Sequence, residues 1–440
     1  MSEALTFVNA AVDADQSFQE IDGFGVNINS RYWENRKLLP VMDLLLEDLG
    51  ANLFRVDIWG KSNWIDPENI GDRSLLNPKE YAKVYGGEIF QRGWGLMRYL
   101  NQHGIKPYLT ASGDVPRWML GADGKTLADT ESFTEMLVSM IEWAKRRENL
   151  DFTLFGPLNE TDIGSPEGPT VNPFDFVRII ELLDKKLKQH GLDDIRLVAA
   201  EQGGYNDHYV RSLLEASSLA SRMGVIGMHM YGNTSSAEMA TVVDLIHNQP
   251  AFSCHSWLTE YGDLEQTGER EWLVAWLMTH RLMNALEAGF QGALAWDAFD
   301  NYHDHDEAWT IYGLIRTGLR TFTPKKRFYA SKHFYRFICP SYKRISVQTE
   351  STDLRLLAFT NQDRSKITMA GMNSGRVCYL NVRFKGFPET TLSRKVDYYR
   401  TSSSENCAHI NEIPLFSRSW PYDGLIAHIP EGCIFSLVME

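Results

Sequence analysis

The sequence is poor in three features that would each indicate a particular class of protein. Its 440 residues include only five cysteines, widely spaced and without a CxxC pair, which argues against a disulfide framework and against a zinc site. No stretch of about 18 uninterrupted apolar residues occurs, so we expect no membrane insertion. Basic residues are outnumbered, with 44 Lys and Arg against 57 Asp and Glu, and the net charge of -13 argues against nucleic acid as a partner.

The beginning of the chain also lacks a recognisable targeting signal. Residues 1–16 show no basic start followed by an apolar run, so no signal peptide is expected in the given chain. A secreted protein whose signal has been removed and a cytoplasmic protein both fit this pattern, and the oligomeric state stays open. Hydrophobic residues (43%) and aromatic residues (12%) are plentiful, enough for a large core and for flat apolar faces.

Eight apolar segments, each followed by a helical pattern, organise most of the chain. Near-continuous apolar strands that alternate with helices predict a parallel sheet covered by helices, and eight such units favour a closed (β/α)8 TIM barrel over residues 19–335. The predicted strands are residues 24–29, 52–58, 106–112, 152–160, 196–202, 225–231, 253–260 and 292–297.

A different pattern begins near residue 341, where short alternating runs are separated by turns. This pattern predicts an accessory all-β sandwich domain. An early strand at residues 5–11 is expected to join it, so the side domain would combine residues 1–18 with 336–440. No low-complexity linker separates the two parts, which predicts a packed side domain.

Two of the predicted barrel strands end on a glutamate. Residues 152–162 (FTLFGPLNETD) lead to Asn159 and Glu160, and residues 253–263 (SCHSWLTEYGD) lead to Glu260. A lone glutamate of this kind could cap a helix or pair with a loop cation, because a half-buried carboxyl needs a partner or a shifted pKa. Two carboxylates from different strand ends are what glycoside hydrolysis requires.

Other polar residues fall near the ends of barrel strands. Arg55 lies on an apolar strand and must be paired; a pairing with Glu260 would keep that carboxylate ionised, although a purely structural ion pair is the alternative. Tyr231 could donate a hydrogen bond to Glu260. His229 either contacts a sugar hydroxyl or is a satisfied core histidine.

Aromatic residues in the loops are candidates for the walls of a sugar site. Trp296 is the candidate floor, and every candidate wall could instead cover the barrel rim. The candidate walls are Trp59, Trp64, Trp118 and Tyr302. The run His303, Asp304, His305 and Asp306 contains metal-ligand types, but alternating ligands on one loop rarely complete a site, so we expect no metal and no cofactor.

These motifs resemble the retaining glycoside hydrolases of clan A. Asn159-Glu160 resembles the acid/base strand, Glu260 within Thr-Glu-Tyr-Gly resembles the nucleophile strand, and Arg55, His229, Tyr231 and Trp296 stand where that clan places subsite residues. Within the clan, the Asp-Gly-Phe-Gly segment at 22–25 and residues 115–119, 329–334 and 337–345 are most similar to glycoside hydrolase family 30, with families 5, 39 and 79 also open.

The resemblance implies roles for individual residues. Glu160 would be the general acid/base, Glu260 the nucleophile, and Asn159 a hydrogen-bond partner of the sugar 2-hydroxyl. The resulting hypothesis is a retaining β-glycoside hydrolase that needs no cofactor and cleaves β-linked oligo- or polysaccharides. A catalytically inactive carbohydrate-binding barrel and an inverting hydrolase are the alternatives.

Overall fold

The computed structural model describes residues 6–34, 36–59, 78–265, 267–300, 311–318, 320–393, 395–411, 415–417 and 424–440. Trp64, Tyr302 and residues 303–306, together with the side chain of Trp59, lie outside these described residues.

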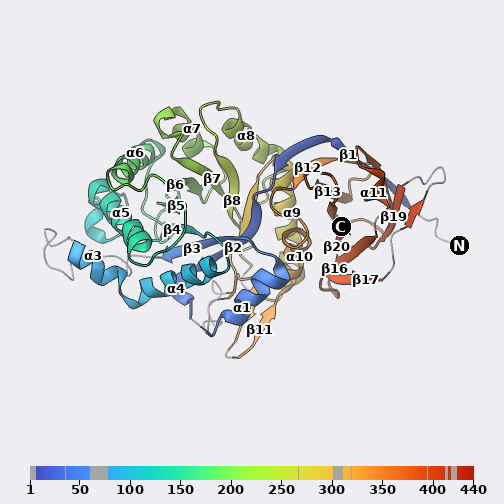
Figure 1. Ribbon diagram of the computed structural model, residues 1–440, viewed down its shortest axis with the longest axis horizontal. Coiled ribbons are helices and arrows are strands. Elements are labelled where there is room, and N and C mark those ends of the chain that lie inside the picture. Colours follow the sequence, from blue (N-terminus) through green and yellow to red (C-terminus); the bar gives the residue numbers. More distant parts are fainter. Residues whose placement is uncertain are drawn as a thin grey trace.

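Eight parallel strands close into the predicted barrel, seen in the left half of Figure 1. Every neighbouring pair is parallel, and β9 pairs back onto β2 to complete the ring. The strands are β2 (Gly23–Asn29), β3 (Leu53–Trp59), β4 (Tyr108–Ser112), β5 (Leu154–Gly156), β6 (Arg196–Gln202), β7 (Met223–Met230), β8 (His255–Tyr261) and β9 (Gly292–Ala295).

Helices surround the barrel on its outside (Figure 1). Alternate residues of each strand therefore face either these helices or the barrel interior; in β3, Phe54, Val56 and Ile58 join the main hydrophobic core. The helices are α1 (Leu39–Asp43), which continues as a π-helical turn (Leu44–Leu49), α3 (Pro78–Tyr85), α4 (Glu88–Gln102), α5 (Thr130–Arg146), α6 (Pro173–Gln189), α7 (His208–Glu215), α8 (Ser236–His247), α9 (Glu271–Ala288) and α10 (Lys326–Tyr335). Short 3-10 turns lie at Ser30–Tyr32, Arg117–Met119 and Ser217–Leu219, and a hairpin is formed by β10 (Ile315–Thr317) and β11 (Phe322–Pro324).

The strand that leads to Glu160 is shorter than the sequence predicts. β5 ends at Gly156, and the next residue is Pro157, which has no N–H to continue a ladder. Glu160 lies four residues after Gly156, with φ at +42°, a left-handed conformation. Its N–H donates to the carbonyl of Glu201, 2.9 Å away, so the segment is held against β6 without being a strand.

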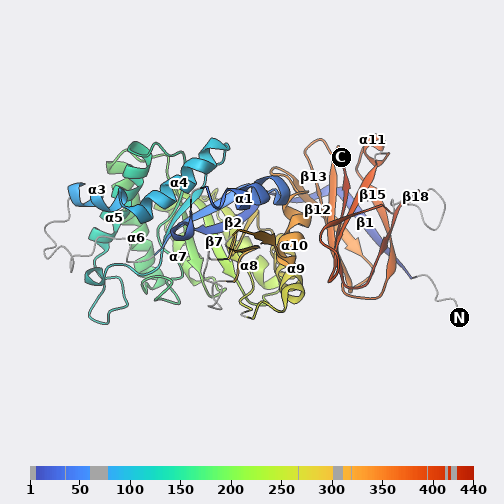
Figure 2. The ribbon, with the colours of Figure 1, turned by 90° about the horizontal axis from the view of Figure 1, so that it is seen from below.

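The accessory domain is one curled sheet of ten strands, on the right of Figures 1 and 2. Its hydrogen bonding is continuous, and the curl lets side chains from opposite parts of the sheet share one core. The strand order is β17 (Ala408–Ile410), β16 (Val396–Thr401), β20 (Cys433–Met439), β14 (Ile367–Asn373), β13 (Leu354–Thr360), β12 (Lys343–Thr349), β1 (Phe7–Glu20), β15 (Cys378–Lys385), β19 (Gly424–Ile429) and β18 (Leu415–Ser417), with the short helix α11 (Glu389–Leu392) after β15.

The two parts pack directly against each other. Phe359 and Ile434 of the curled sheet belong to the same buried cluster as Phe328 and Phe334 of α10. His333 of α10 is fully buried and hydrogen-bonds Ser436 and Thr401 at 2.9 and 2.8 Å. The expectation of a packed side domain is therefore confirmed.

The N-terminal strand β1 is an interior strand of the curled sheet. It pairs antiparallel with β12 on one side and parallel with β15 on the other. It extends to Glu20, which is further than the predicted strand and beyond the predicted domain boundary at residue 18.

Among the described residues, no helix has both the length and the apolar character needed to cross a membrane.

Deleting residues 1–18 should destabilise the side domain, because it exposes the edges of both β12 and β15. We expect a lower melting temperature and faster amide exchange in these two strands, with the exchange measured by mass spectrometry.

A matched pair of point variants tests the same strand: Val12 is buried and Ala11 is exposed. Val12→Asp should cost at least about 3 kcal/mol of stability, while Ala11→Asp should cost less than about 0.5 kcal/mol. Equal melting temperatures for the full-length and truncated proteins would contradict the shared domain.

Candidate active site

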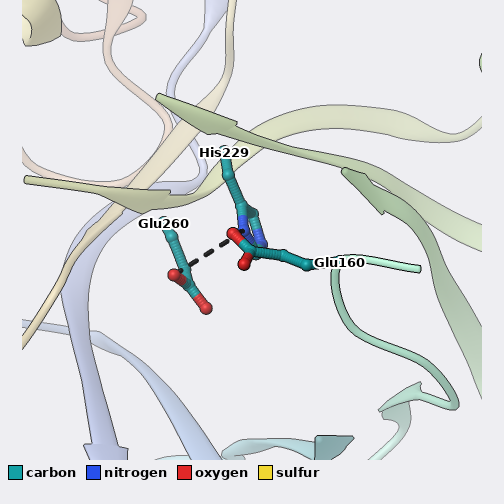
Figure 3. Close-up of side chains that lie close together, drawn as sticks. All are labelled: Glu160, His229 and Glu260. Carbon is teal, nitrogen blue, oxygen red and sulfur yellow. Dashed lines mark hydrogen bonds and ion pairs between the residues drawn. The ribbon is translucent and has the colours of Figure 1, made fainter. Parts of the chain in front are cut away.

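Glu160 and Glu260 face each other at the C-terminal end of the barrel strands (Figure 3). Glu260 belongs to β8, and Glu160 follows β5, three strands away around the barrel. A carboxylate oxygen of each residue and a ring nitrogen of His229 all lie within 4.8 Å of one another. Both carboxyl groups are largely buried, with 7% and 5% of the two residues exposed.

Arg55 connects the residues around Glu260. It is fully buried on β3, and its Nη1 forms an ion pair with Glu260 Oε1 and donates to Asn27 Oδ1 at 2.9 Å. Its Nη2 donates to Asn159 Oδ1 at 2.7 Å. The partner that the sequence requires for Arg55 is therefore Glu260, and the same guanidinium fixes the residue that precedes Glu160.

Tyr231 and His229 complete the contacts of the two glutamates. The Tyr231 hydroxyl donates to Glu260 Oε2 at 2.6 Å, as the sequence analysis anticipated. His229 Nδ1 lies 2.7 Å from Glu160 Oε1 and 3.6 Å from Glu260 Oε2. Burial disfavours a charged imidazole, but the charge of Glu260, the hydrogen bond to Glu160 and the nearby Glu201 carboxylate outweigh it and raise the pKa of His229 to about 10.

Glu201 is a third buried carboxylate, which the sequence analysis did not identify. It lies near the end of β6, has no exposed surface, and accepts a hydrogen bond from the Tyr108 hydroxyl. Its Oε1 is 3.5 Å from Arg55 Nη2 and 3.8 Å from His229 Nε2. Burial would raise its pKa, but the charges of Arg55 and His229 lower it, so Glu201 is ionised. The signal was present, because residues 196–202 are another apolar run that leads to a glutamate.

A cavity of about 440 Å³ opens above these groups. Of the site residues proposed from sequence, Glu160, Glu260, Asn159, Tyr231 and Trp296 line it. Its remaining lining residues are Asp57, Ser112, Ile163, Glu167, Gly203, Leu264 and Tyr312. Asp57, Ser112 and Glu167 are polar residues that the sequence analysis missed; Asp57 follows Arg55 by two positions and so shares its face of β3.

Three of the sequence candidates do not belong to the lining. Arg55 and His229 are fully buried beneath the cavity and contact carboxylates, so the predicted sugar contact of His229 is replaced by contacts to Glu160 and Glu201. Trp118 lies on the 3-10 turn Arg117–Met119 and packs against the main core, which matches the alternative that it covers the barrel rim.

Glu160, His229 and Glu260 are ligand types that could hold a metal ion. Their surroundings do not fit one, because Arg55 already places a positive charge against Glu260. A protonated His229 also has no free lone pair to offer a metal. The three side chains therefore favour carboxylate chemistry in which Arg55 and protonated His229, and not a metal ion, supply the positive charge.

Known proteins share this overall fold. No protein-family model matches the chain. The structure is similar to a glycoside hydrolase family 30 subfamily 8 xylanase from Clostridium acetobutylicum, with 18% identity, a TM-score of 0.73 and coverage of 98% of this chain and 99% of that one. The chain has the fold of family 30 glycoside hydrolases. The resemblance noted from the sequence motifs is thus confirmed at the level of the fold.

Two further structures extend the comparison. The catalytic domain of a family 30 xylanase from Talaromyces cellulolyticus has 19% identity and a TM-score of 0.73, covering 98% of this chain and 100% of that one. An endo-β-1,6-glucanase has 14% identity and a TM-score of 0.67, with coverage of 99% and 96%.

The charge of Glu201 should hold the proton on His229. In Glu201→Gln, we expect the pKa of His229 to fall by about one unit or more, because a negative charge 3.8 Å from Nε2 is lost. Nitrogen NMR of the imidazole rings measures this pKa. His333 provides an internal control, since burial lowers its pKa to about 3 and it should remain neutral in both proteins.

The same shift predicts how stability depends on pH. The folded-state pKa of His229 lies above the unfolded value of about 6.5, so its contribution is complete below pH 6.5 and is lost as pH rises towards 10. Urea unfolding between pH 7 and 9.5 should show this decline, with a slope of at most about 1.4 kcal/mol per pH unit. A slope equally steep in Glu201→Gln would contradict the coupling between the two residues.

Proposed function

We propose that the protein is a retaining β-glycoside hydrolase that cleaves β-linked oligo- or polysaccharides. The observation that carries the proposal is the approach of the Glu160 and Glu260 carboxylate oxygens to within 4.8 Å inside one cavity. Retaining enzymes place the two carboxyl groups about 5 to 5.5 Å apart, whereas inverting enzymes need about 6.5 to 9.5 Å to admit a water molecule. The xylanase and glucanase activities of proteins with this fold support a β-linked polysaccharide as substrate.

In the first step, Glu160 gives its proton to the glycosidic oxygen while Glu260 attacks the anomeric carbon. The bond between that carbon and the leaving oxygen breaks, the leaving group departs as an alcohol, and the sugar becomes an ester of Glu260. In the second step, Glu160 takes a proton from water as the water oxygen attacks the same carbon, and the ester bond to Glu260 breaks. Two displacements restore the original anomeric configuration.

The contacts of the two glutamates support this division of roles. Glu260 receives the Arg55 ion pair and the Tyr231 hydrogen bond, which favour an ionised nucleophile. Glu160 contacts His229 and has no arginine partner among the described residues.

Asn159 supports the same step through its position. Arg55 fixes its side-chain oxygen, and its Nδ2 donates to the carbonyl of Glu167 at 3.3 Å. This arrangement presents the amide group at the cavity wall beside Glu160. We assign it the contact to the sugar 2-hydroxyl, where hydrogen bonds strengthen in the transition state.

Hydrolysis should proceed with retention. Proton NMR during cleavage of an aryl β-glycoside or a β-linked oligosaccharide should detect the β-anomer first, followed by slow mutarotation. An initial α-anomer would indicate a single displacement and would refute the nucleophilic role of Glu260.

Replacing the two glutamates should affect activity in different ways. Glu260→Gly should lower turnover of all β-glycosides by several orders of magnitude, because no glycosyl ester can form. Glu160→Ala should spare the first step for dinitrophenyl glycosides, whose phenolate leaves without a proton, and stall natural substrates. Added azide should give a β-glycosyl azide with Glu160→Ala and an α-glycosyl azide with Glu260→Gly, as identified by NMR. The opposite assignment of the two azides would exchange the roles.

A further inference from the structure

Asp57 is a buried carboxyl that the reaction described above does not use. It lies on β3, is 1% exposed, and forms part of the cavity wall. Ser112 at the end of β4 donates to its Oδ1, and Ser30 donates to its backbone carbonyl at 2.8 Å. Its Oδ2 has no hydrogen-bond partner among the described residues. One oxygen is thus fixed by the protein, while the other is buried without a partner in a residue that lines the cavity.

This arrangement is costly unless Oδ2 gains a hydrogen-bond partner. A buried carboxyl oxygen without a partner loses the hydrogen bond that water would give it, and the loss is larger if the carboxyl is charged. Burial is the main cause that raises the pKa of Asp57 to about 7, against the lowering effect of Arg55. An orphaned carboxyl beside two catalytic carboxyls is explained if a ligand supplies the missing hydrogen bond.

The charge of the cavity restricts what that ligand can be. Four carboxyl groups line it, those of Asp57, Glu160, Glu167 and Glu260. Burial, followed by the charges of Glu160, Glu260 and Asp57, raises the pKa of Glu167 to about 7. No lysine or arginine lines the cavity within the described part of the chain. A sugar carboxylate would therefore meet repulsion, whereas a hydroxyl would find an acceptor.

We propose that Asp57 accepts a hydrogen bond from one ring hydroxyl of an uncharged sugar and thereby determines which sugar the cavity takes. This inference rests on the proposed glycosidase function and adds a specificity-determining residue to it. Asp57 acts on binding and orientation, while Glu160 and Glu260 carry out the bond changes.

The test pairs Asp57 with individual hydroxyls of the substrate. The probes are dinitrophenyl β-glycosides of glucose, galactose and xylose, their monodeoxy derivatives, and the glucuronide. For each substrate, kcat/KM of Asp57→Ala is divided by that of the wild type, so intrinsic reactivity cancels. We expect a loss of about 10- to 100-fold for substrates that carry one particular hydroxyl, and little loss for the derivative that lacks it.

Glu167→Gln is the matched control. It removes a second carboxyl from the same cavity, again one with a pKa near 7, but leaves Asp57 in place. If Asp57 acts through a local hydrogen bond, Glu167→Gln will leave the dependence on that hydroxyl unchanged. If both variants reduce kcat/KM by the same factor for all substrates, the inference is overturned. A glucuronide that is cleaved faster than the glucoside overturns it as well.

Stability separates a binding role from a structural one. Asp57→Asn removes a buried carboxyl that lacks a full set of partners, so we expect an unchanged or higher melting temperature together with altered sugar preference. A clear loss of stability without a change in preference would assign Asp57 to the fold alone.

The outcome for Asp57 can be distinguished from the outcome for the proposed function. If the wild type cleaves the glycosides but Asp57→Ala shows no dependence on any hydroxyl, the inference fails and the glycosidase stands. If the wild type cleaves none of them, the glycosidase proposal fails, and calorimetric titration with the same glycosides decides the inference. Binding that loses its dependence on one hydroxyl in Asp57→Ala supports it, and absence of binding overturns it.

Discussion

The site depends on one buried guanidinium. Arg55 has no exposed surface and contacts Glu260, Asn159, Asn27 and Glu201, which come from four other segments around the barrel. An arginine can be buried in this way only when its charge is balanced and its N–H groups are bonded. Arg55 and the carboxylates therefore depend on each other: the carboxylates neutralise the charge of Arg55, and Arg55 holds them in place. Removing this residue would leave two buried carboxylates without their cation.

The backbone around the same cluster adopts conformations that ordinary residues rarely take. Glu160, Ala200 and Glu201 have φ values of +42°, +78° and +43°. Left-handed conformations of non-glycine residues are costly, and they persist where the surrounding structure holds them. Here the hydrogen bond from the Glu160 N–H to the Glu201 carbonyl joins the two segments. Backbone strain at this point places one carboxyl in the cavity and another beneath it.

Much of the architecture is readable from the sequence because it follows from repeated local patterns. Apolar strands that alternate with amphipathic helices can bury both faces only as a covered parallel sheet, and the change to alternating runs near residue 341 marks the second sheet. Glu160 and Glu260 were recognisable because each polar residue interrupts an apolar run at its end. Glu201 follows the same rule at the third such run and was overlooked, since its neighbours carry no motif that resembles a known family.

What the sequence by itself determined is therefore the order and type of the elements and the pair of glutamates that strand ends bring together. Only the tertiary structure decided that His229 contacts carboxylates and does not line the cavity, and that Trp118 packs against the core. It also decided that Asp57, which lines the cavity, has a buried carboxyl oxygen without a partner. The physical reason is that burial, charge and hydrogen bonding at these positions depend on residues from strands distant in the chain, and local periodicity carries no information about such partners.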